Sequence, residues 1–319
     1  MKRRAWGVCV ALGVACVVSA ASPSADVSAV DWSLRSVLSR TSGRTAVVAV
    51  RNREIVASDG RNANAFTPLH LASISKTLTA VAVLRLAERG DVNLNQPISR
   101  YIPDYFPDDS NSALGSQPVS AFLNHVTGSR SNNLRAVSSG ILHYRGYAKL
   151  AATLDTSSVG QYKYSNDNYV LLTVLVEEVT KRDFAVAARQ LVWQPLGVWG
   201  GYLDTWTHAT RVLGGAGAWV TSAFNVALLM DALEPTTPGD KLLSDQWMTF
   251  LHRENPVAHY RNGLRYRNGY WGHTGSLARV RSAAIAGNKG VSYAVLSEGA
   301  TPESSDKLFD ALISLDQRQ

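Results

Sequence analysis

Patterns typical of β-strands occur near the two ends of this 319-residue chain, and patterns typical of helices fill the middle. A β-branched run over residues 45–51 is joined by Asn52-Arg53 to a second run over 54–57, which predicts a hairpin. Near the other end, strands are predicted over residues 263–267, 277–286 and 291–297. Strands this far apart share a sheet only if the chain returns to its start, so we expect one mostly antiparallel sheet built from both chain ends.

Apolar residues recur at helical spacing between these strands and beside them. Helices are expected over residues 31–40, 73–88, 168–180, 184–193, 223–233, 244–252 and 302–315. Asn166 is well placed to cap the helix that starts near residue 168. Residues 91–160 are rich in Pro, Ser, Asn and Gly, so short helices and loops are expected there.

These elements give an α+β fold, in which terminal helices flank the antiparallel sheet and an all-helical subdomain is inserted in the middle. We expect the sheet subdomain to contain roughly residues 21–70 and 255–319, and the helical subdomain roughly residues 71–254. The two subdomains are expected to form one catalytic domain over residues 21–319, since no linker separates them.

The first 20 residues are typical of a secretory signal peptide. Three basic residues at positions 2–4 precede an apolar run over residues 5–18, and small residues follow at 19–22. A transmembrane anchor would need about 20 apolar residues, and a lipoprotein signal using Cys16 would normally carry Leu where Gly13 stands. We therefore expect a secreted or periplasmic protein that meets the membrane only through this transient leader.

Composition argues against several other classes of protein. Both cysteines, Cys9 and Cys16, lie in the leader, so the exported chain would have neither a disulfide nor a thiol nucleophile. The seven histidines show no metal-binding spacing and no dinucleotide fingerprint is complete, so we expect no metal and no cofactor. Without the leader, basic residues exceed acidic ones by only four, which is too few to indicate nucleic-acid binding.

The excess arginines gather near the C-terminal end of the chain. They are either solvated residues on strands or a means of attracting an anionic substrate, and the sequence leaves both roles open. They are Arg253, Arg261, Arg265, Arg267, Arg279 and Arg281.

Ser73 and Lys76 form a Ser-x-x-Lys motif at the start of a predicted helix. Spacing of three residues places the hydroxyl and the amine on one helical face, within mutual reach. Burial would lower the pKa of the lysine, so that it could accept the proton of a serine nucleophile. The same pattern at Ser304 and Lys307 lies among acidic and polar residues and is interpreted as a solvated helix face.

Two further motifs carry groups that suit acyl transfer. Tyr164-Ser165-Asn166 offers a phenol for proton transfer and an amide that can hold a carbonyl group. His273-Thr274-Gly275-Ser276 lies on or beside a strand, whose edge could present a backbone N–H to an oxyanion.

The three motifs, in this order and at these separations, resemble the serine penicillin-recognising superfamily of class C β-lactamases, DD-carboxypeptidases, D-aminopeptidases and related esterases. The resemblance extends over most of the chain after the leader, including Asn124-His125-Val126-Thr127-Gly128. It implies that Ser73 is acylated, that Lys76 is its base and that Tyr164 assists proton transfer.

The same resemblance assigns the substrate-binding groups. Asn166 would help to hold the substrate amide, and the main-chain N–H groups of Ser73 and Ser276 would form the oxyanion hole. Thr274 would lie near the substrate carboxylate, with Gly275 beside it. His273 stands where β-lactamases have a lysine, and a histidine is mostly neutral at pH 7, which argues against an efficient β-lactamase.

We therefore expect an exported serine hydrolase that acts through an acyl-enzyme on a small-molecule or peptide substrate. The preferred substrates are expected to be D-amino-acid or peptidoglycan-type peptides, cleaved by a DD-carboxypeptidase-like or D-aminopeptidase-like amidase. An esterase or a weak class C-type β-lactamase is the alternative, followed by a family member that binds penicillin or peptidoglycan without turnover. The oligomeric state is left open.

Overall fold

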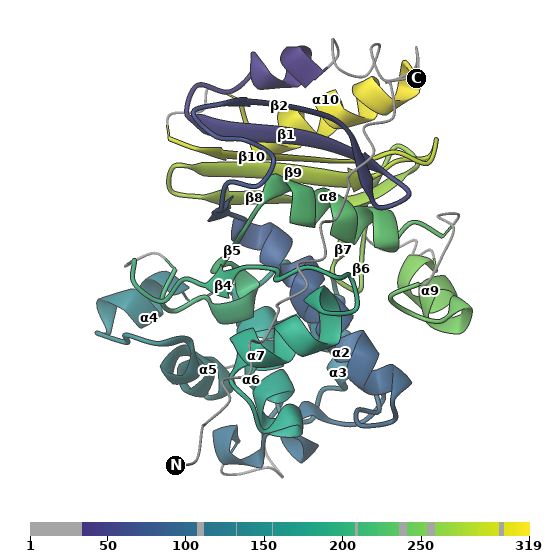
Figure 1. The fold of residues 1–319 in the computed structure, drawn as a ribbon. Coiled ribbons are helices and arrows are strands. Elements are labelled where there is room, and N and C mark those ends of the chain that lie inside the picture. Colours follow the sequence, from purple (N-terminus) through teal and green to yellow (C-terminus); the bar gives the residue numbers. More distant parts are fainter. Residues whose placement is uncertain are drawn as a thin grey trace, which may run out of the picture.

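The computed structural model describes residues 34–106, 112–131, 133–154, 156–207, 210–235, 241–253, 259–299 and 303–319. The leader predicted at residues 1–20, with both cysteines, lies outside the described residues. The described chain forms a sheet layer with helices on both faces, above a second layer made mostly of helices (Figure 1).

The large sheet is antiparallel and draws its strands from both chain ends, as predicted. The strand order is β2-β1-β10-β9-β8-β7-β6, and each strand runs antiparallel to its neighbours. Val47 of β1 lies opposite Val295 of β10. The strands are β1 (Arg44–Arg51), β2 (Glu54–Arg61), β6 (Tyr260–Arg261), β7 (Leu264–Arg267), β8 (Tyr270–Leu277), β9 (Val280–Ala286) and β10 (Ser292–Glu298).

A strand was predicted over residues 277–286, but the observed strand β9 begins only at Val280. The chain turns at Ala278, whose φ is 43°, and this turn separates β8 from β9. Strand β8 was not predicted as such, because His273 and the glycines at 272 and 275 weaken the strand pattern. As a result, the third motif lies within a strand of the sheet, paired with β9 on one side.

Both faces of the sheet are covered. On one face, residues 34–38 and α10 (Ser305–Gln317) pack against side chains such as Val47 and Val295. On the other, α8 (Ala223–Ala232) packs on β1 and β10, although its residues belong to the segment assigned to the helical subdomain (Figure 1). Because both faces are buried, strands β1 and β10 consist largely of apolar residues instead of alternating apolar and polar ones.

The second layer is built around α2 (Ser75–Glu88) and α6 (Asn166–Thr180), which pack on each other. A small sheet with strand order β3-β5-β4 also lies there, so the inserted subdomain is not all-helical. The helices are α3 (Val119–Leu123), α4 (Asn133–Ser138), α5 (Tyr144–Ala152), α7 (Phe184–Ala188) and α9 (Asp245–His252), and the strands are β3 (Leu69–His70), β4 (Tyr202–Leu203) and β5 (Trp219–Thr221). Among the residues that the structure describes, no helix is both long enough and apolar enough to cross a membrane.

Helix α6 begins two residues earlier than predicted. Its N-cap is Ser165, whose side chain accepts a hydrogen bond from the backbone N–H of Asp167. The prediction that Asn166 caps this helix was therefore wrong. Because Ser165 caps the helix, the side chain of Asn166 is available to accept a hydrogen bond from Lys76.

Candidate active site

Ser73 lies in a 3-10 turn, η1 (Ala72–Ile74), that leads directly into α2. The sheet holds this turn in place, because Ser282 of β9 donates a hydrogen bond of 2.7 Å to the carbonyl oxygen of Leu71. Gly275 of β8 packs so closely on the turn that a Cβ there would collide with the same carbonyl oxygen. The serine turn and the third motif are thus fixed against each other, and Ser73 remains partly exposed.

Lys76 is fully buried one turn after Ser73. Its Nζ donates to Ser73 Oγ at 3.2 Å, to Asn166 Oδ1 at 2.8 Å and to the carbonyl oxygen of Ala216 at 2.6 Å. Burial lowers the pKa of Lys76 to about 7. A substantial fraction of this amine is therefore neutral near pH 7, and it can accept the proton of Ser73.

Tyr164 completes this group from the turn before α6. Its ring lies 4.9 Å from Lys76 Nζ, and its hydroxyl interacts with Ser73. The ring is 37% exposed, yet desolvation raises the pKa of its phenol, and the hydrogen bond to Ser73 only partly opposes this effect. A phenol that stays protonated can relay or donate a proton, so Lys76 is the better base and Tyr164 the better proton donor.

His273 projects from β8 into the buried space behind Tyr164. Its Nδ1 lies 2.6 Å from the carbonyl oxygen of Thr274, and its Nε2 lies 3.4 Å from the Tyr260 hydroxyl. Burial, together with the positive charges of Lys76 and Arg265, lowers the pKa of His273 to about 3. The side chain is therefore neutral at pH 7 and adds no positive charge to the site.

Positive charge reaches the site from Arg265 instead. Its Nη1 donates to Thr274 Oγ1 at 2.5 Å and pairs with Asp306 Oδ1 at 2.5 Å. Thr274 and Ser276 line a cavity of about 410 Å³ together with Arg265 and Arg281. Arg281 donates to backbone carbonyl oxygens, and no described residue forms an ion pair with it.

The sequence alone leaves the role of these arginines open and does not place Arg265 in the site. Strand β7 pairs with β8 so that Arg265 lies opposite Gly272 and diagonally beside Thr274. A hairpin prediction for residues 264–277 would have found this relationship. It was not made because the strand on or beside which His273 was expected had no predicted bounds.

The second Ser-x-x-Lys pattern has a structural role. Ser304 caps α10 by accepting a hydrogen bond of 3.3 Å from the backbone N–H of Lys307. Lys307 Nζ pairs with Glu303 at 3.2 Å, and both motif residues are exposed. Neither group has the geometry found at Ser73 and Lys76.

His125 is a further residue of the site to which sequence reasoning gave no role. It is fully buried, and its Nδ1 accepts from the backbone N–H of Ser165 at 3.2 Å and from Asn168 Nδ2 at 3.0 Å. Its position in the family-like block after Asn124 was the signal that could have identified it. This histidine fixes the turn that carries Tyr164.

In the described part of the chain, no group of three or more His, Cys, Asp or Glu side chains is arranged to hold a metal ion. The structure brings Ser73, Lys76, Tyr164 and Asn166 into mutual contact. It places His273 behind them and Thr274 and Ser276 at the neighbouring cavity. This arrangement can perform acyl transfer with Ser73 as the nucleophile.

Comparisons with known proteins show the family of this chain. The family model described as Beta-lactamase matches residues 37–317. The esterase EstB of Burkholderia gladioli is 31% identical over 211 residues, which are 57% of this chain and only 52% of EstB. The alignment therefore spans about half the length of that relative.

Solved structures share the fold at low sequence identity. SurE superposes with a TM-score of 0.73 and 19% identity, over 92% of this chain and 76% of SurE. The D-amino acid amidase of Ochrobactrum anthropi SV3, solved with D-phenylalanine, gives a TM-score of 0.72 and 16% identity, over 92% of this chain and 100% of the amidase. At these identities the likeness concerns the fold.

Proposed function

Because this chain belongs to the beta-lactamase family and is a serine hydrolase, we propose that it cleaves acylated peptides that end in a D-amino acid with a free carboxylate. The observation that carries this proposal is the contact of Arg265 with Thr274 beside the Ser73 turn. A guanidinium group and a hydroxyl side by side suit a carboxylate, which accepts hydrogen bonds from both.

The acylation step follows from the hydrogen bonds around Lys76. Its neutral amine takes the proton of Ser73 while Oγ attacks the scissile carbonyl carbon and forms a tetrahedral intermediate. The main-chain N–H groups of Ser73 and Ser276 would stabilise the oxyanion. When the C–N bond breaks, the proton passes through Lys76 or Tyr164 to the leaving amine, which departs as the free D-amino acid.

Deacylation uses the same groups in reverse. A water molecule loses its proton to the neutral Lys76 or, through Tyr164, to that lysine, and attacks the ester carbonyl carbon. Collapse of the intermediate returns a proton to Ser73 Oγ and releases the carboxylic acid. Asn166 accepts from Lys76 through Oδ1, so its amide nitrogen is the side-chain donor suited to the substrate carbonyl group.

The free carboxylate of the leaving residue would lie in the cavity beside β8. Arg265 shares its charge with Asp306, but a guanidinium group has five N–H donors and can bind a second carboxylate. Arg281 at the same cavity adds positive charge. Glu303 also lines the cavity, but its carboxylate pairs with Arg40 and Lys307. Since His273 is neutral, Arg265 and Arg281 would replace the lysine that β-lactamases carry in the third motif.

An esterase is the second candidate, and the similarity to EstB favours it. An uncharged ester has no group for Arg265 to bind, whereas a peptide acid does. The two candidates are therefore separated by how strongly the rate depends on a free carboxylate.

The test compares kcat/KM on an N-acylated D-Ala-D-Ala peptide, on its C-terminal amide and on a short-chain ester. We expect the acid to exceed the amide at least tenfold, and Arg265→Gln to remove most of this preference with little effect on the ester. Arg267→Gln is the matched control, because Arg267 lies two residues along the same strand and pairs with Asp310 at 2.9 Å. An ester preference of about a hundredfold, or about 2.7 kcal/mol, would instead assign an esterase.

Export through the leader is part of the same proposal, since a peptide of the cell wall lies outside the cytoplasm. The charged, apolar and small-residue segments of residues 1–22 support it. The intact mass of protein recovered outside the cytoplasm should correspond to a chain that starts near Ala21. Recovery of that protein with Met1 to Ala20 still attached would contradict it.

A further inference from the structure

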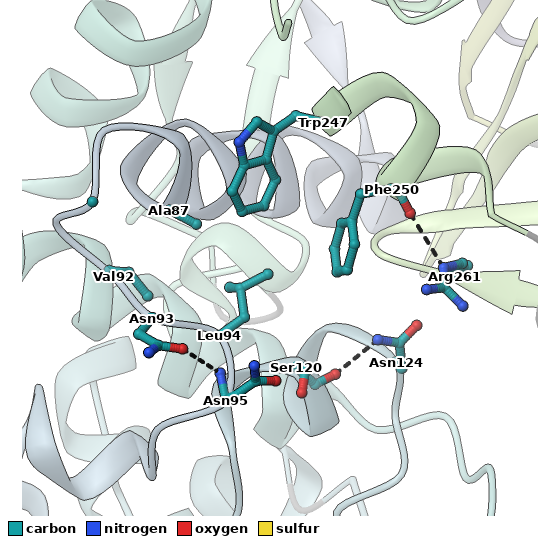
Figure 2. A pocket seen from close by; sticks show the side chains of 11 residues that line it. Ala87, Val92, Asn93, Leu94, Asn95, Ser120, Asn124, Trp247, Phe250 and Arg261 are labelled. Atoms are coloured by element: carbon teal, nitrogen blue, oxygen red, sulfur yellow. Dashed lines mark hydrogen bonds between the residues drawn. The ribbon is translucent and has the colours of Figure 1, made fainter. Parts of the chain in front are cut away.

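A second pocket, of about 630 Å³, lies at the opposite end of α2 from Ser73. Figure 2 shows the side chains that line it. Ala87, near the last residue of α2, lines it, whereas Ser73 precedes the first. Fourteen helical residues at about 1.5 Å each separate the two places by about 20 Å. The pocket is therefore distinct from the acyl-transfer site, and none of its lining residues belongs to that site.

One wall of this pocket is aromatic. Trp247 and Phe250 extend from α9 toward Leu94, with ring centroids 5.5 Å apart and planes at 67° (Figure 2). Both rings are partly exposed instead of being buried in the core. An indole or phenyl face in this position can pack on a flat apolar surface of a ligand.

The facing wall carries amides and a hydroxyl. Asn93, Asn95, Ser120 and Asn124 lie across from the rings (Figure 2). Asn93 Oδ1 accepts from the backbone N–H of Asn95 at 3.0 Å, and Asn124 Nδ2 donates to the carbonyl oxygen of Ser120 at 2.8 Å. These bonds hold the wall in place, while the Asn95 amide has no partner among the described residues and can bind a ligand.

Arg261 closes one end of the pocket and supplies a positive charge. Its Nε donates to the carbonyl oxygen of Phe250 at 3.3 Å, and its guanidinium group lies 5.5 Å from the Phe250 ring centroid. No described carboxylate pairs with it. Burial and the neighbouring charge of Arg253 lower the pKa of Arg261, so an added anion would be favourable there.

We propose that this pocket binds an acidic saccharide, with the C–H face of a sugar ring on Trp247, its polar substituents on the asparagine wall and its carboxylate on Arg261. A purely apolar ligand would cover the Asn95 amide without giving it a hydrogen-bond partner, and a neutral sugar would leave the guanidinium group without a counter-charge. The volume suits a mono- or disaccharide, since small-molecule sites span roughly 300–1,000 Å³.

Calorimetric titration of the full-length protein with three probes tests the proposal. N-acetylmuramic acid and glucuronic acid carry a carboxylate and represent two sources of acidic sugar, and N-acetylglucosamine is the neutral counterpart of the first. We expect at least one acid to bind with a dissociation constant of about 1 mM or below, and at least fivefold more tightly than N-acetylglucosamine. Equal binding of acid and neutral sugar, or no binding of any probe at about 20 mM, would overturn the proposal.

Four variants locate the binding. Trp247→Leu, Asn95→Ala and Arg261→Gln should each weaken binding of the acid at least fivefold, and Arg261→Gln should abolish the difference from the neutral sugar. Trp199→Leu is the control, because that indole is 73% exposed and packs on Arg189. Asn95 is exposed, so its variant keeps the test valid if Trp247→Leu does not fold.

Ser73→Ala should bind the acidic sugar as the natural chain does. Its result separates the failure of this proposal from the failure of the proposed function. Binding unchanged in all three pocket variants, or lost to the same extent in Trp199→Leu, would place the sugar elsewhere.

Discussion

The ring of His125 lies 4.4 Å, centroid to centroid, from the ring of Tyr164. Tyr169 and Tyr260 also pack on this histidine, at 5.1 and 4.7 Å. Since Nδ1 accepts two hydrogen bonds, the proton of the neutral ring resides on Nε2, which is buried. His125 thus supports Tyr164 through its ring and through the turn that carries it.

Replacing His125 by Phe would keep most of the ring volume and remove the Nδ1 acceptor. Two buried donors, the Ser165 N–H and the Asn168 amide, would lose their partner, at a cost of about 1–3 kcal/mol each. We expect a loss of about 2–4 kcal/mol in the free energy of unfolding, measured in urea, together with a lower kcat. His252→Phe, at a half-buried histidine outside the site, is the control. Equal stability of His125→Phe and the natural chain would refute this role.

The pKa of Lys76 sets the pH dependence of the reaction. Because the neutral amine is the base, kcat/KM should fall as the pH decreases through about 7, the pKa of Lys76. His125 and His273 both have lowered pKa values and remain neutral there, so they should not contribute to this limb. The profile is measured on an ester between pH 5 and 9, and an unchanged rate over that range would exclude Lys76 as the base.

The two Ser-x-x-Lys patterns can be compared directly. Ser73→Ala removes the acyl-enzyme route and should lower kcat by several orders of magnitude. Ser304→Ala removes a helix cap at the cavity beside β8, and should lower stability by about 1 kcal/mol while keeping the activity on an ester, which has no carboxylate to place in that cavity. Both variants are assayed on a p-nitrophenyl ester. Similar rates for the two would overturn the assignment of the nucleophile.

Penicillin should acylate Ser73, and the penicilloyl group should then be hydrolysed from the serine slowly. Rapid hydrolysis needs a dedicated base for water, and Glu177 on α6 cannot serve, because Tyr144 donates to it at 2.7 Å and Arg145 pairs with it at 2.9 Å. A fluorescent penicillin should label the protein, and peptide mass spectrometry should locate the adduct on the peptide that contains Ser73. Consumption of the drug in large molar excess within minutes would reveal a competent β-lactamase.

His70 links the two sheets through two carboxylates. Its Nδ1 lies 2.6 Å from Glu298 and its Nε2 lies 3.0 Å from Asp204. The hydrogen bond to Glu298, followed by that to Asp204, raises the pKa of His70 against the effect of burial. Burial acts to raise the pKa values of Asp204 and Glu298, but hydrogen bonds involving His70 hold both below their usual range.

These directions predict a window of stability. The contribution of His70 is present below its usual pKa of 6.5 and is lost as the pH rises through its higher folded value. The contribution of the carboxylates is lost as the pH falls below their usual range near 4. His70→Asn should therefore destabilise the protein more at pH 5.5 than at pH 9, in urea unfolding at both values. An equal effect at the two pH values would contradict this prediction.

Long periodic segments were predictable from the sequence, and short or irregular ones were not. The hairpin of β1 and β2 and the buried helix α2 were found because their apolar patterns extend over many residues. The small sheet was not predicted, because its strands have only two or three residues and are too short to show alternating apolar and polar residues. The bounds of strand β8 were not predicted, because glycines such as Gly275, which let the strand approach the serine turn, are poor strand formers.

The site shows the same division. The resemblance of the three motifs to a known family identified Ser73, Lys76, Tyr164 and Asn166, and the structure brings them together, while their chemical roles stay predictions. Arg265 was missed because its place depends on the register of two neighbouring strands, a tertiary property.

The pairing of β1 with β10 also sets the order in which the protein can mature. The hairpin of β1 and β2 can form early, but two strands alone are marginally stable, and its free edge exposes unpaired backbone groups. β10, which covers that edge, is synthesised after every reactive side chain of the site, from Ser73 to Ser276. If synthesis stopped before residue 292, the released chain would contain every reactive side chain of the site but would lack the strand that joins β1 to β9. Such a fragment would expose strand edges and apolar surface, so chaperones would bind it or proteases would degrade it.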